Sequence, residues 1–124
     1  MCVKVFPCAL SMANKEPERL DLLQGTLEMM ALRTLLLGPS NGYQIARRIE
    51  QMSDGVLDID HGSLYPALHR LEKRGWLSAK WEMSDTNRRA KYYRLTAAGR
   101  KQLLAEHSKW ERLAGAIARV MRPA

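Results

Sequence analysis

Residues 63–96, "SLYPALHRLEKRGWLSAKWEMSDTNRRAKYYRLT", carry the strongest indication of the fold of this chain. Its first half has the spacing of an amphipathic helix, in which Leu64, Leu68 and Leu71 form an inward stripe and Gly75 follows as a stop signal. Its second half alternates between apolar and polar residues, breaks at a run of turn-forming residues and returns as a second short run. Such alternation is typical of a half-buried strand. The stretch therefore predicts a helix followed by a β-hairpin.

Pro66 looks like an interruption of the predicted helix. If the helix begins near Ser63, however, Pro66 falls in the first turn, where backbone N–H groups have no helical partner to lose. We therefore predict one continuous helix that ends at Gly75. The side chains that would face outward or lie along its edges are Tyr65, His69, Arg70, Lys73 and Arg74.

The hairpin is predicted from residues 77–83 and 91–95, with turn-forming residues between them. Arg88 and Arg89 would then stand at its tip. The inward side chains would be Leu77, Ala79, Trp81 and Met83 on the first strand and Lys91, Tyr93 and Leu95 on the second. The hairpin is thus expected to have an apolar side and a basic tip.

Two further helices are predicted upstream of this stretch. The first begins at Asp21, which has Gln24 three positions later as in a capping box, and stops at Gly38 and Pro39. This helix has more apolar residues than one stripe needs, which predicts burial on two sides; one explanation is a partner subunit.

The second upstream helix begins after Asn41, again with a glutamine three positions after the cap. Its inward side would carry Tyr43, Ile45, Ala46 and Ile49. Residues 54–62 then combine turn signals around a short β-like run. They predict a short strand between the second and third helices.

A long last helix is predicted after Thr96, its expected cap. The apolar residues that recur along it at helical spacing are Leu103, Trp110, Leu113, Ala114, Ile117 and Met121. Because no later segment of this sequence covers that stripe, we expect it to pack across a dimer.

The composition points to an anionic partner. The chain has 124 residues and a mass of 14.1 kDa, which allows one domain with a modest core. Twenty Lys and Arg residues stand against thirteen Asp and Glu residues, so the formal net charge is +7 and the pI is about 9.8. Eight of the cations lie between residues 70 and 94. A basic excess gathered in one segment favours nucleic acid ahead of a membrane surface.

Other classes of protein lack support in the sequence. The only cysteines, Cys2 and Cys8, lie in the N-terminal tail, so no disulfide framework holds the fold, which fits a reducing cytoplasm. The three histidines are scattered, and no phosphate-binding loop or nucleophile motif is present, so we expect no metal, no cofactor and no catalysis. No apolar run approaches the ~20 residues of a membrane-spanning helix. Residues 1–19 are expected to be a disordered tail or to contain a mis-assigned start, with translation truly beginning at Met12.

The predicted order of elements is helix, helix, short strand, helix and hairpin, which is the order of a winged helix-turn-helix. The fold class is therefore mainly α (α+β). Residues 20–95 would form the winged helix-turn-helix, and residues 96–124 would form a C-terminal dimerisation helix. In such a domain the third helix enters the major groove of DNA while the hairpin lies beside it on the backbone or in the minor groove. The basic segment coincides with these two elements.

Three phrases, "GYQIARRIE", "GSLYPALHRLEKRGWL" and "NRRAKYYRLTAAGRKQL", resemble the PadR family of bacterial transcriptional regulators. The resemblance runs from Leu20 to the C-terminus, and the phrase with Tyr65 and Pro66 is its most diagnostic part. It implies a homodimeric repressor of a nearby promoter, with the C-terminal helix supplying much of the dimer contact. Some members release DNA when a small aromatic or drug-like effector binds near the dimer interface, which makes Trp110 a candidate ligand residue.

Two groups of functional residues follow. The predicted DNA contacts are Ser63, Tyr65, Pro66, His69, Arg70, Lys73, Lys80, Arg88, Arg89, Lys91 and Tyr92. The predicted dimer contacts are Leu27, Met30, Leu103, Trp110, Leu113, Ala114, Ile117 and Met121.

Two alternatives stay open at this point. One is a winged helix that mediates protein–protein assembly, with an incidental basic surface. The other is a ligand sensor whose effector is the main biological input.

Overall fold

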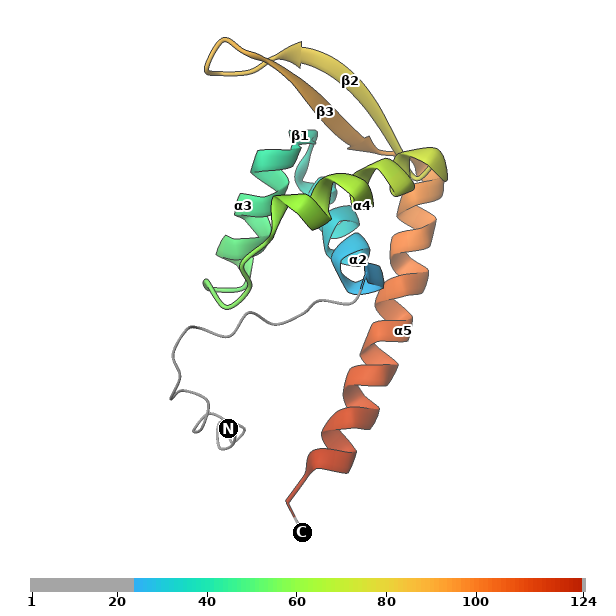
Figure 1. Ribbon diagram of the computed structural model, residues 1–124. Helices are drawn as coiled ribbons and strands as arrows, with labels where there is room; N and C mark the ends of the chain where they lie inside the picture. The colour runs from blue at the N-terminus through green and yellow to red at the C-terminus, as the bar shows by residue number, and fades with distance from the viewer. Residues whose placement is uncertain (1–23, 124) are drawn as a thin grey trace.

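The structure, a computed structural model, describes residues 24–123 (Figure 1). The predicted tail, residues 1–19, and the predicted cap Asp21 lie outside the described residues. The elements are α2 (Gln24–Thr34), the 3-10 turn η2 (Leu35–Leu37), β1 (Ser40–Asn41), α3 (Gly42–Met52), α4 (His61–Lys73), β2 (Leu77–Met83), β3 (Arg89–Leu95) and α5 (Ala97–Met121). Helices α2, α3 and α4 pack around a common core, the β2–β3 hairpin rises from the end of α4, and α5 runs down past α2 (Figure 1).

Helix α2 lies at the centre of the domain and contacts α3, α4 and α5 of its own chain. This accounts for its burial on more than one side without a partner subunit. The predicted stop at Gly38 is confirmed, because Gly38 follows η2 with a positive φ of 129°. A residue with a side chain rarely adopts that backbone conformation.

The short strand of the domain lies earlier in the chain than the sequence predicts. β1 pairs antiparallel with β3, with Ser40 opposite Tyr93, and the strand order is β1-β3-β2. The β-like run near residues 56–60 forms no strand. In that run Ile59 is buried and its N–H donates to the Glu50 carboxylate (3.3 Å), so a side chain satisfies the backbone in place of a strand partner.

Helix α3 begins as predicted, with a complete capping box. The Asn41 side chain accepts from the Gln44 N–H (2.9 Å), and the Gln44 side chain accepts from the Asn41 N–H (3.0 Å). Its buried side is formed by Gly42, Ile45, Ala46 and Ile49. Tyr43, which was predicted to face inward, is 56% exposed.

Helix α4 begins two residues earlier than predicted. Asp60 is its cap and accepts from the Gly62 N–H (3.3 Å), so Pro66 is the sixth residue of the helix and not part of the first turn. The explanation by partnerless N–H groups was therefore wrong. Gly62, four residues before Pro66, is exposed, so water can satisfy its carbonyl in place of the missing N–H.

The hairpin, hereafter the wing, leaves the core after its first residues. Leu77 is buried and Ala79 is partly buried, as predicted, but Trp81 and Met83 are 56% and 62% exposed. The alternation of the strand continues beyond the point where the core ends, so these two side chains have no domain surface to cover. Tyr93 is 5% exposed and anchors β3 to the core, as expected.

The junction between the wing and α5 is built by Thr96. Its side chain caps α5 by accepting from the Gly99 N–H (3.0 Å) and donates to the Gly75 carbonyl (2.7 Å). Its own N–H donates to the Trp76 carbonyl (3.1 Å). The predicted cap is confirmed, and it also joins the end of α4 to the start of α5.

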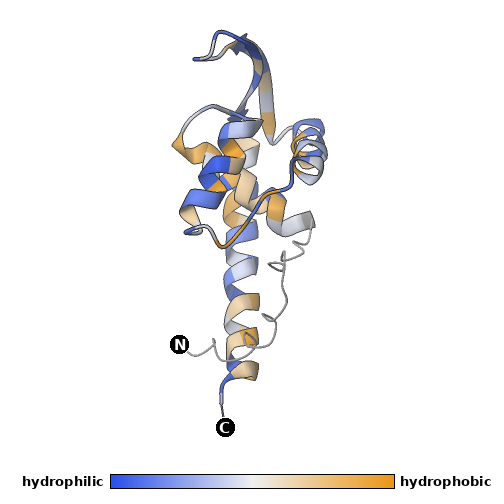
Figure 2. Cartoon of the chain, turned by 60° about the vertical axis from the view of Figure 1, so that its left-hand side comes forward, coloured by the Kyte–Doolittle hydropathy of each residue, from blue (hydrophilic) through white to orange (hydrophobic). Residues whose placement is uncertain are grey.

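Beyond Leu103, α5 extends away from the domain (Figure 1). Orange, apolar segments recur along this projecting half (Figure 2). The large apolar side chains exposed there include Trp110, Leu113, Ile117, Val120 and Met121.

Candidate nucleic-acid interface

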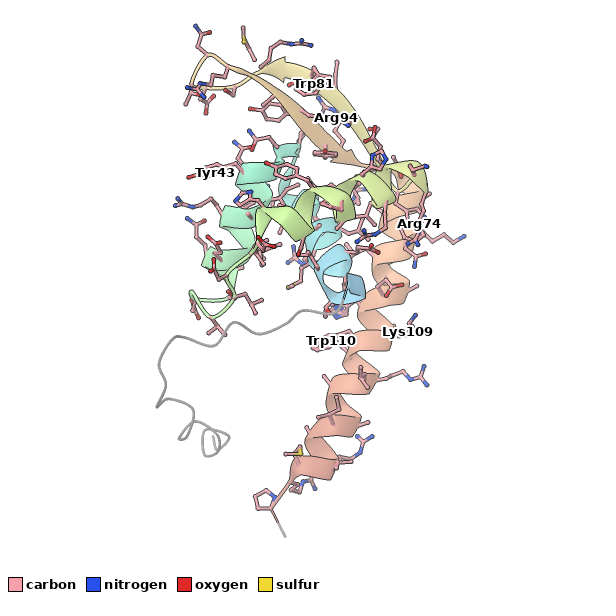
Figure 3. The ribbon with its side chains drawn as sticks, in the orientation of Figure 1. Tyr43, Arg74, Trp81, Arg94, Lys109 and Trp110 are labelled. Carbon is pink, nitrogen blue, oxygen red and sulfur yellow. The ribbon has the colours of Figure 1, made fainter. Side chains whose placement is uncertain are left out.

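A hollow of about 840 Å³ lies between the wing and the start of α3. Three aromatic side chains line this hollow: Tyr43 from α3, Tyr65 from α4 and Trp81 from the wing. Figure 3 labels Tyr43 and Trp81. The other lining residues are Asn41, Gly42, Gln44, Ser84, Asp85, Thr86, Arg88, Arg89, Ala90, Lys91, Tyr92 and Tyr93. The hollow therefore combines aromatic rings, cations and helix-cap amides, which suit a sugar-phosphate backbone.

Tyr65 packs directly against Gly42 at the start of α3. A Cβ placed on Gly42 would overlap the Tyr65 ring. Tyr65 is 47% exposed and its ring lies 5.8 Å from the His61 ring, centroid to centroid. Glycine at this position thus lets α4 present a tyrosine at the surface of the hollow.

We expect Gly42→Ala to weaken duplex binding because the new methyl group displaces the Tyr65 ring. The same substitution made in a Tyr65→Ala background should cost little, because the ring is gone. Duplex affinity measured by fluorescence anisotropy for the two single variants and the double variant gives the coupling between the sites. Additive losses in affinity would contradict the proposed contact.

Half of the eight cations between Arg70 and Arg94 are ion-paired within the chain. Arg94 pairs with Glu82 (3.1 Å), and Lys91 pairs with Glu72 (3.0 Å). Within residues 24–123, the four that have no ion pair are Lys73, Lys80, Arg88 and Arg89. All four of these side chains are exposed. They are the cations best placed to neutralise an external anion.

The remaining two cations share one carboxylate. Arg70 Nε lies 2.8 Å from Glu28 Oε2, and Arg74 Nη1 lies 3.6 Å from Glu28 Oε1.

Two of the cations with an ion pair, Arg70 and Lys91, were predicted from the sequence to contact DNA. Their ion pairs instead tie α4 to α2 and the wing to α4, so neither is proposed below as a DNA contact.

The Lys91 pair and the neighbouring ring strengthen the wing's attachment. The hydrogen bond to Glu72 raises the pKa of Lys91 above its usual range, so the ammonium group stays charged. Burial raises the pKa of the Tyr93 hydroxyl, which stays neutral. The Lys91 Nζ also lies 5.6 Å from the centre of the Tyr93 ring. The wing is therefore held to α4 by a lysine in the middle of β3, opposite Trp81 of β2.

The outer part of the wing presents an aromatic ring and a cation together. The Arg89 guanidinium lies 5.2 Å from the centre of the exposed Trp81 ring. Lys80 and Tyr92 are paired across the two strands. Arg88, at the turn, donates its N–H to the Ser84 hydroxyl (3.3 Å) while its side chain is exposed.

The start of α4 places the remaining predicted contacts at the surface. Ser63, Pro66 and His69 are exposed. The Ser63 hydroxyl donates to Asp60 Oδ2 (3.2 Å). To donate to a phosphate, the hydroxyl would have to give up this hydrogen bond.

Sequence reasoning missed two residues of α3. Arg47 donates to the Tyr43 hydroxyl (3.2 Å) and lies 5.9 Å from the centre of its ring. Both side chains are exposed next to the hollow, and Tyr43 projects from the side of α3 (Figure 3). The signal was available, because the spacing of Gly42, Ile45 and Ile49 defines the inward side and leaves Tyr43 off it.

Within the described part of the chain, no three His, Cys, Asp or Glu side chains are grouped so that they could hold a metal ion. None of the helices in residues 24–123 has the length and apolarity to cross a membrane.

Comparison with known proteins agrees with this geometry. Residues 31–105 match the family described as "Transcriptional regulator PadR-like family". The chain belongs to the PadR-like family of transcriptional regulators. It is accordingly a DNA-binding regulator and not an enzyme.

Solved PadR-like and related regulators share the fold. A transcriptional regulator from Clostridium thermocellum is 30% identical with a TM-score of 0.72, covering 80% of this chain and 93% of that one. A PadR family regulator from Eggerthella lenta is 29% identical with a TM-score of 0.66, covering 82% and 86%. An uncharacterized protein X of Lysinibacillus sphaericus is 32% identical over 93 residues, 74% of this chain and 84% of its own length.

The dimer contacts expected for a PadR-like chain divide into two groups. Leu27 and Leu103 are 5% and 6% exposed and pack in the core of their own chain, so each offers a second chain little surface. Met30 is partly buried against the same core. The predicted residues that remain accessible lie on the projecting half of α5: Trp110, Leu113, Ala114, Ile117 and Met121.

Proposed function

We propose that this PadR-like regulator is a homodimeric, sequence-specific repressor of a nearby promoter, acting in the cytoplasm. In this proposal α4 enters the major groove and the wing lies on the flanking backbone or in the minor groove. The observation that carries it is the distribution of cations. Eight cations lie between residues 70 and 94, and four of them are exposed on α4 and the wing without an ion pair to the described residues: Lys73, Lys80, Arg88 and Arg89.

The projecting half of α5 supports a dimer. Trp110, Leu113 and Ile117 are 43%, 51% and 50% exposed and recur at helical spacing. A large apolar stripe left in water favours association. Two chains related by a two-fold axis would place their α4 helices on half-sites about one helical turn, ~34 Å, apart.

The experiment for the DNA contact is the double substitution Arg88→Ala with Arg89→Ala. We expect weaker duplex binding and a shallower dependence of affinity on salt, by about 0.9 unit of slope for each phosphate that the variant no longer neutralises. The measurement is affinity for a duplex selected from a randomised pool, titrated over a range of salt concentrations.

The matched control is Arg112→Ala with Arg119→Ala. This variant makes the same charge change on exposed arginines of α5, away from the wing. We expect it to keep the wild-type salt slope. Equal slopes for both double variants and the wild-type protein would favour the alternative, a protein–protein interaction module with an incidental basic surface.

An effector that releases DNA is a finer part of the proposal. Trp110 is 43% exposed on the projecting half of α5 (Figure 3), so a ligand site there would need a second chain to form its other wall. Tryptophan fluorescence of the dimer against a panel of small aromatic compounds tests this; no response from any of them would remove Trp110 as a ligand residue.

A further inference from the structure

Glu28 has an environment that is unusual for a carboxylate. It is 8% exposed, on the central helix α2, and it is the only Asp or Glu among the buried residues of the described chain. Buried charges are costly unless they are paired and hydrogen-bonded. A carboxylate at this position therefore needs partners, and it finds them in α4.

Each oxygen of Glu28 faces a different arginine, Arg70 in the last turn of α4 and Arg74 at its C-cap. Arg70 donates from Nε to Oε2 at 2.8 Å, and Arg74 Nη1 lies 3.6 Å from Oε1. Arg70 and Arg74 are four positions apart, so they lie on the same side of the helix. Two contacts, one helical turn apart, oppose both rotation of α4 about its axis and sliding of α4 along α2.

The same contact reaches the base of the wing and the scaffold. The Arg74 guanidinium lies 5.1 Å from the centre of the Trp76 ring, which begins the path from α4 into the wing. Figure 3 places Arg74 at this end of α4, next to the start of α5. On its other side, α2 packs against α5, the helix proposed to join two chains.

In this contact the carboxylate is buried, while the Arg70 and Arg74 side chains are 34% and 50% exposed. Such a pair is weak as a source of stability, because the desolvation of the carboxylate offsets most of the attraction. The directional hydrogen bond from Arg70, with the second ion pair to Arg74 beside it, in contrast selects one arrangement of α2 and α4. An apolar pair at this position would fill the space without selecting the rotation of α4.

We propose that Glu28 is a positioning residue for DNA binding, whose carboxylate holds α4 against α2 so that the recognition helices of a dimer meet their half-sites in register. The inference rests on the proposed role of α4 in DNA recognition. Glu28 itself touches no DNA in this arrangement. It also keeps Arg70 and Arg74 from neutralising phosphates indiscriminately.

The test compares Glu28→Gln with the wild-type protein on two duplexes of equal length: one selected by the wild-type protein from a randomised pool, and one with that sequence scrambled. We expect the ratio of the two affinities to fall by about tenfold, the equivalent of one mismatched base pair. On the scrambled duplex the salt slope should become steeper, by up to about 0.9 unit for each arginine released. A variant that is only less stable would not gain salt dependence.

Two further variants complete the experiment. Glu82→Gln, which releases Arg94 on the wing, is the control and should keep the selected-to-scrambled ratio. The second variant, Glu28→Met with Arg70→Met, replaces the pair by apolar side chains and keeps the proposal testable if Glu28→Gln does not fold. Its ratio of selected-duplex to scrambled-duplex affinity should also fall.

An unchanged ratio in a folded Glu28 variant would overturn the positioning role alone. If the wild-type protein bound both duplexes equally, the proposed recognition by α4 would fail together with it.

Discussion

The double substitution Leu113→Glu with Ile117→Glu is expected to convert the protein to monomers and to weaken binding to the selected duplex by about 10²- to 10⁴-fold. Both side chains are half-exposed on the projecting part of α5, so in a single chain they meet water and the substitutions should leave the domain folded. In a dimer they would bury four carboxylates in an apolar contact, which is strongly unfavourable. A monomer keeps one recognition helix and loses the affinity that comes from joining two.

Leu104→Glu is the control for that variant. Leu104 is more exposed, at 72%, but it lies nine positions before Leu113, about two and a half helical turns away and therefore on the opposite side of α5. We expect this variant to stay dimeric. Mass measured by light scattering during size-exclusion chromatography, with circular dichroism as a check of folding, distinguishes the outcomes. A dimer that survives both glutamates on the stripe would place the interface elsewhere.

Gly99→Ala is expected to lower the free energy of unfolding by about 3 kcal/mol. Gly99 is buried in the first turn of α5, and a Cβ there would overlap the Trp76 carbonyl oxygen and lie 2.9 Å from Leu95 Cδ1. The carbonyl belongs to the backbone and already accepts from the Thr96 N–H, so it cannot yield as a flexible side chain would. Urea denaturation followed by circular dichroism measures the loss.

Gly115→Ala is the matched control, since it adds the same methyl group to the same helix. A Cβ on Gly115 would meet only Arg119 Nη1, at the ordinary contact distance of 3.7 Å. Alanine is the better helix former by up to about 1 kcal/mol, so this variant should be slightly more stable than the wild-type protein. Equal effects of the two substitutions would mean that the contact with the Trp76 carbonyl is not what makes an added methyl group costly at Gly99.

The local features of the fold could be predicted from the sequence because their causes are neighbours in the chain. The capping box at Asn41, the cap at Thr96 and the end of a helix before Gly75 depend on residues within a few positions of one another, and the structure confirms all three. The error at Pro66 came from the same kind of reasoning, because Asp60 and Ser63 are both good caps and only the structure shows which one begins α4.

The candidate site could be predicted only as a segment. Alternation along residues 77–83 identified a strand, but not the point at which the core ends, so Trp81 was predicted to face inward although it is exposed. The density of cations identified α4 and the wing. It could not separate the cations held by carboxylates from those that face solvent, because that depends on partners elsewhere in the chain.

The order of the elements, the basic segment and the membership of a regulator family can be predicted from the sequence alone, because each depends on local spacing and composition. The accessibility of the basic side chains, in contrast, depends on how the elements pack together. The partners that decide it are distant: Glu28 lies 42 positions from Arg70, and Glu72 lies 19 positions from Lys91. No pattern along the chain specifies such a pairing, since it arises when α2, α4 and the wing pack together and the desolvation of each charge requires an opposite charge nearby.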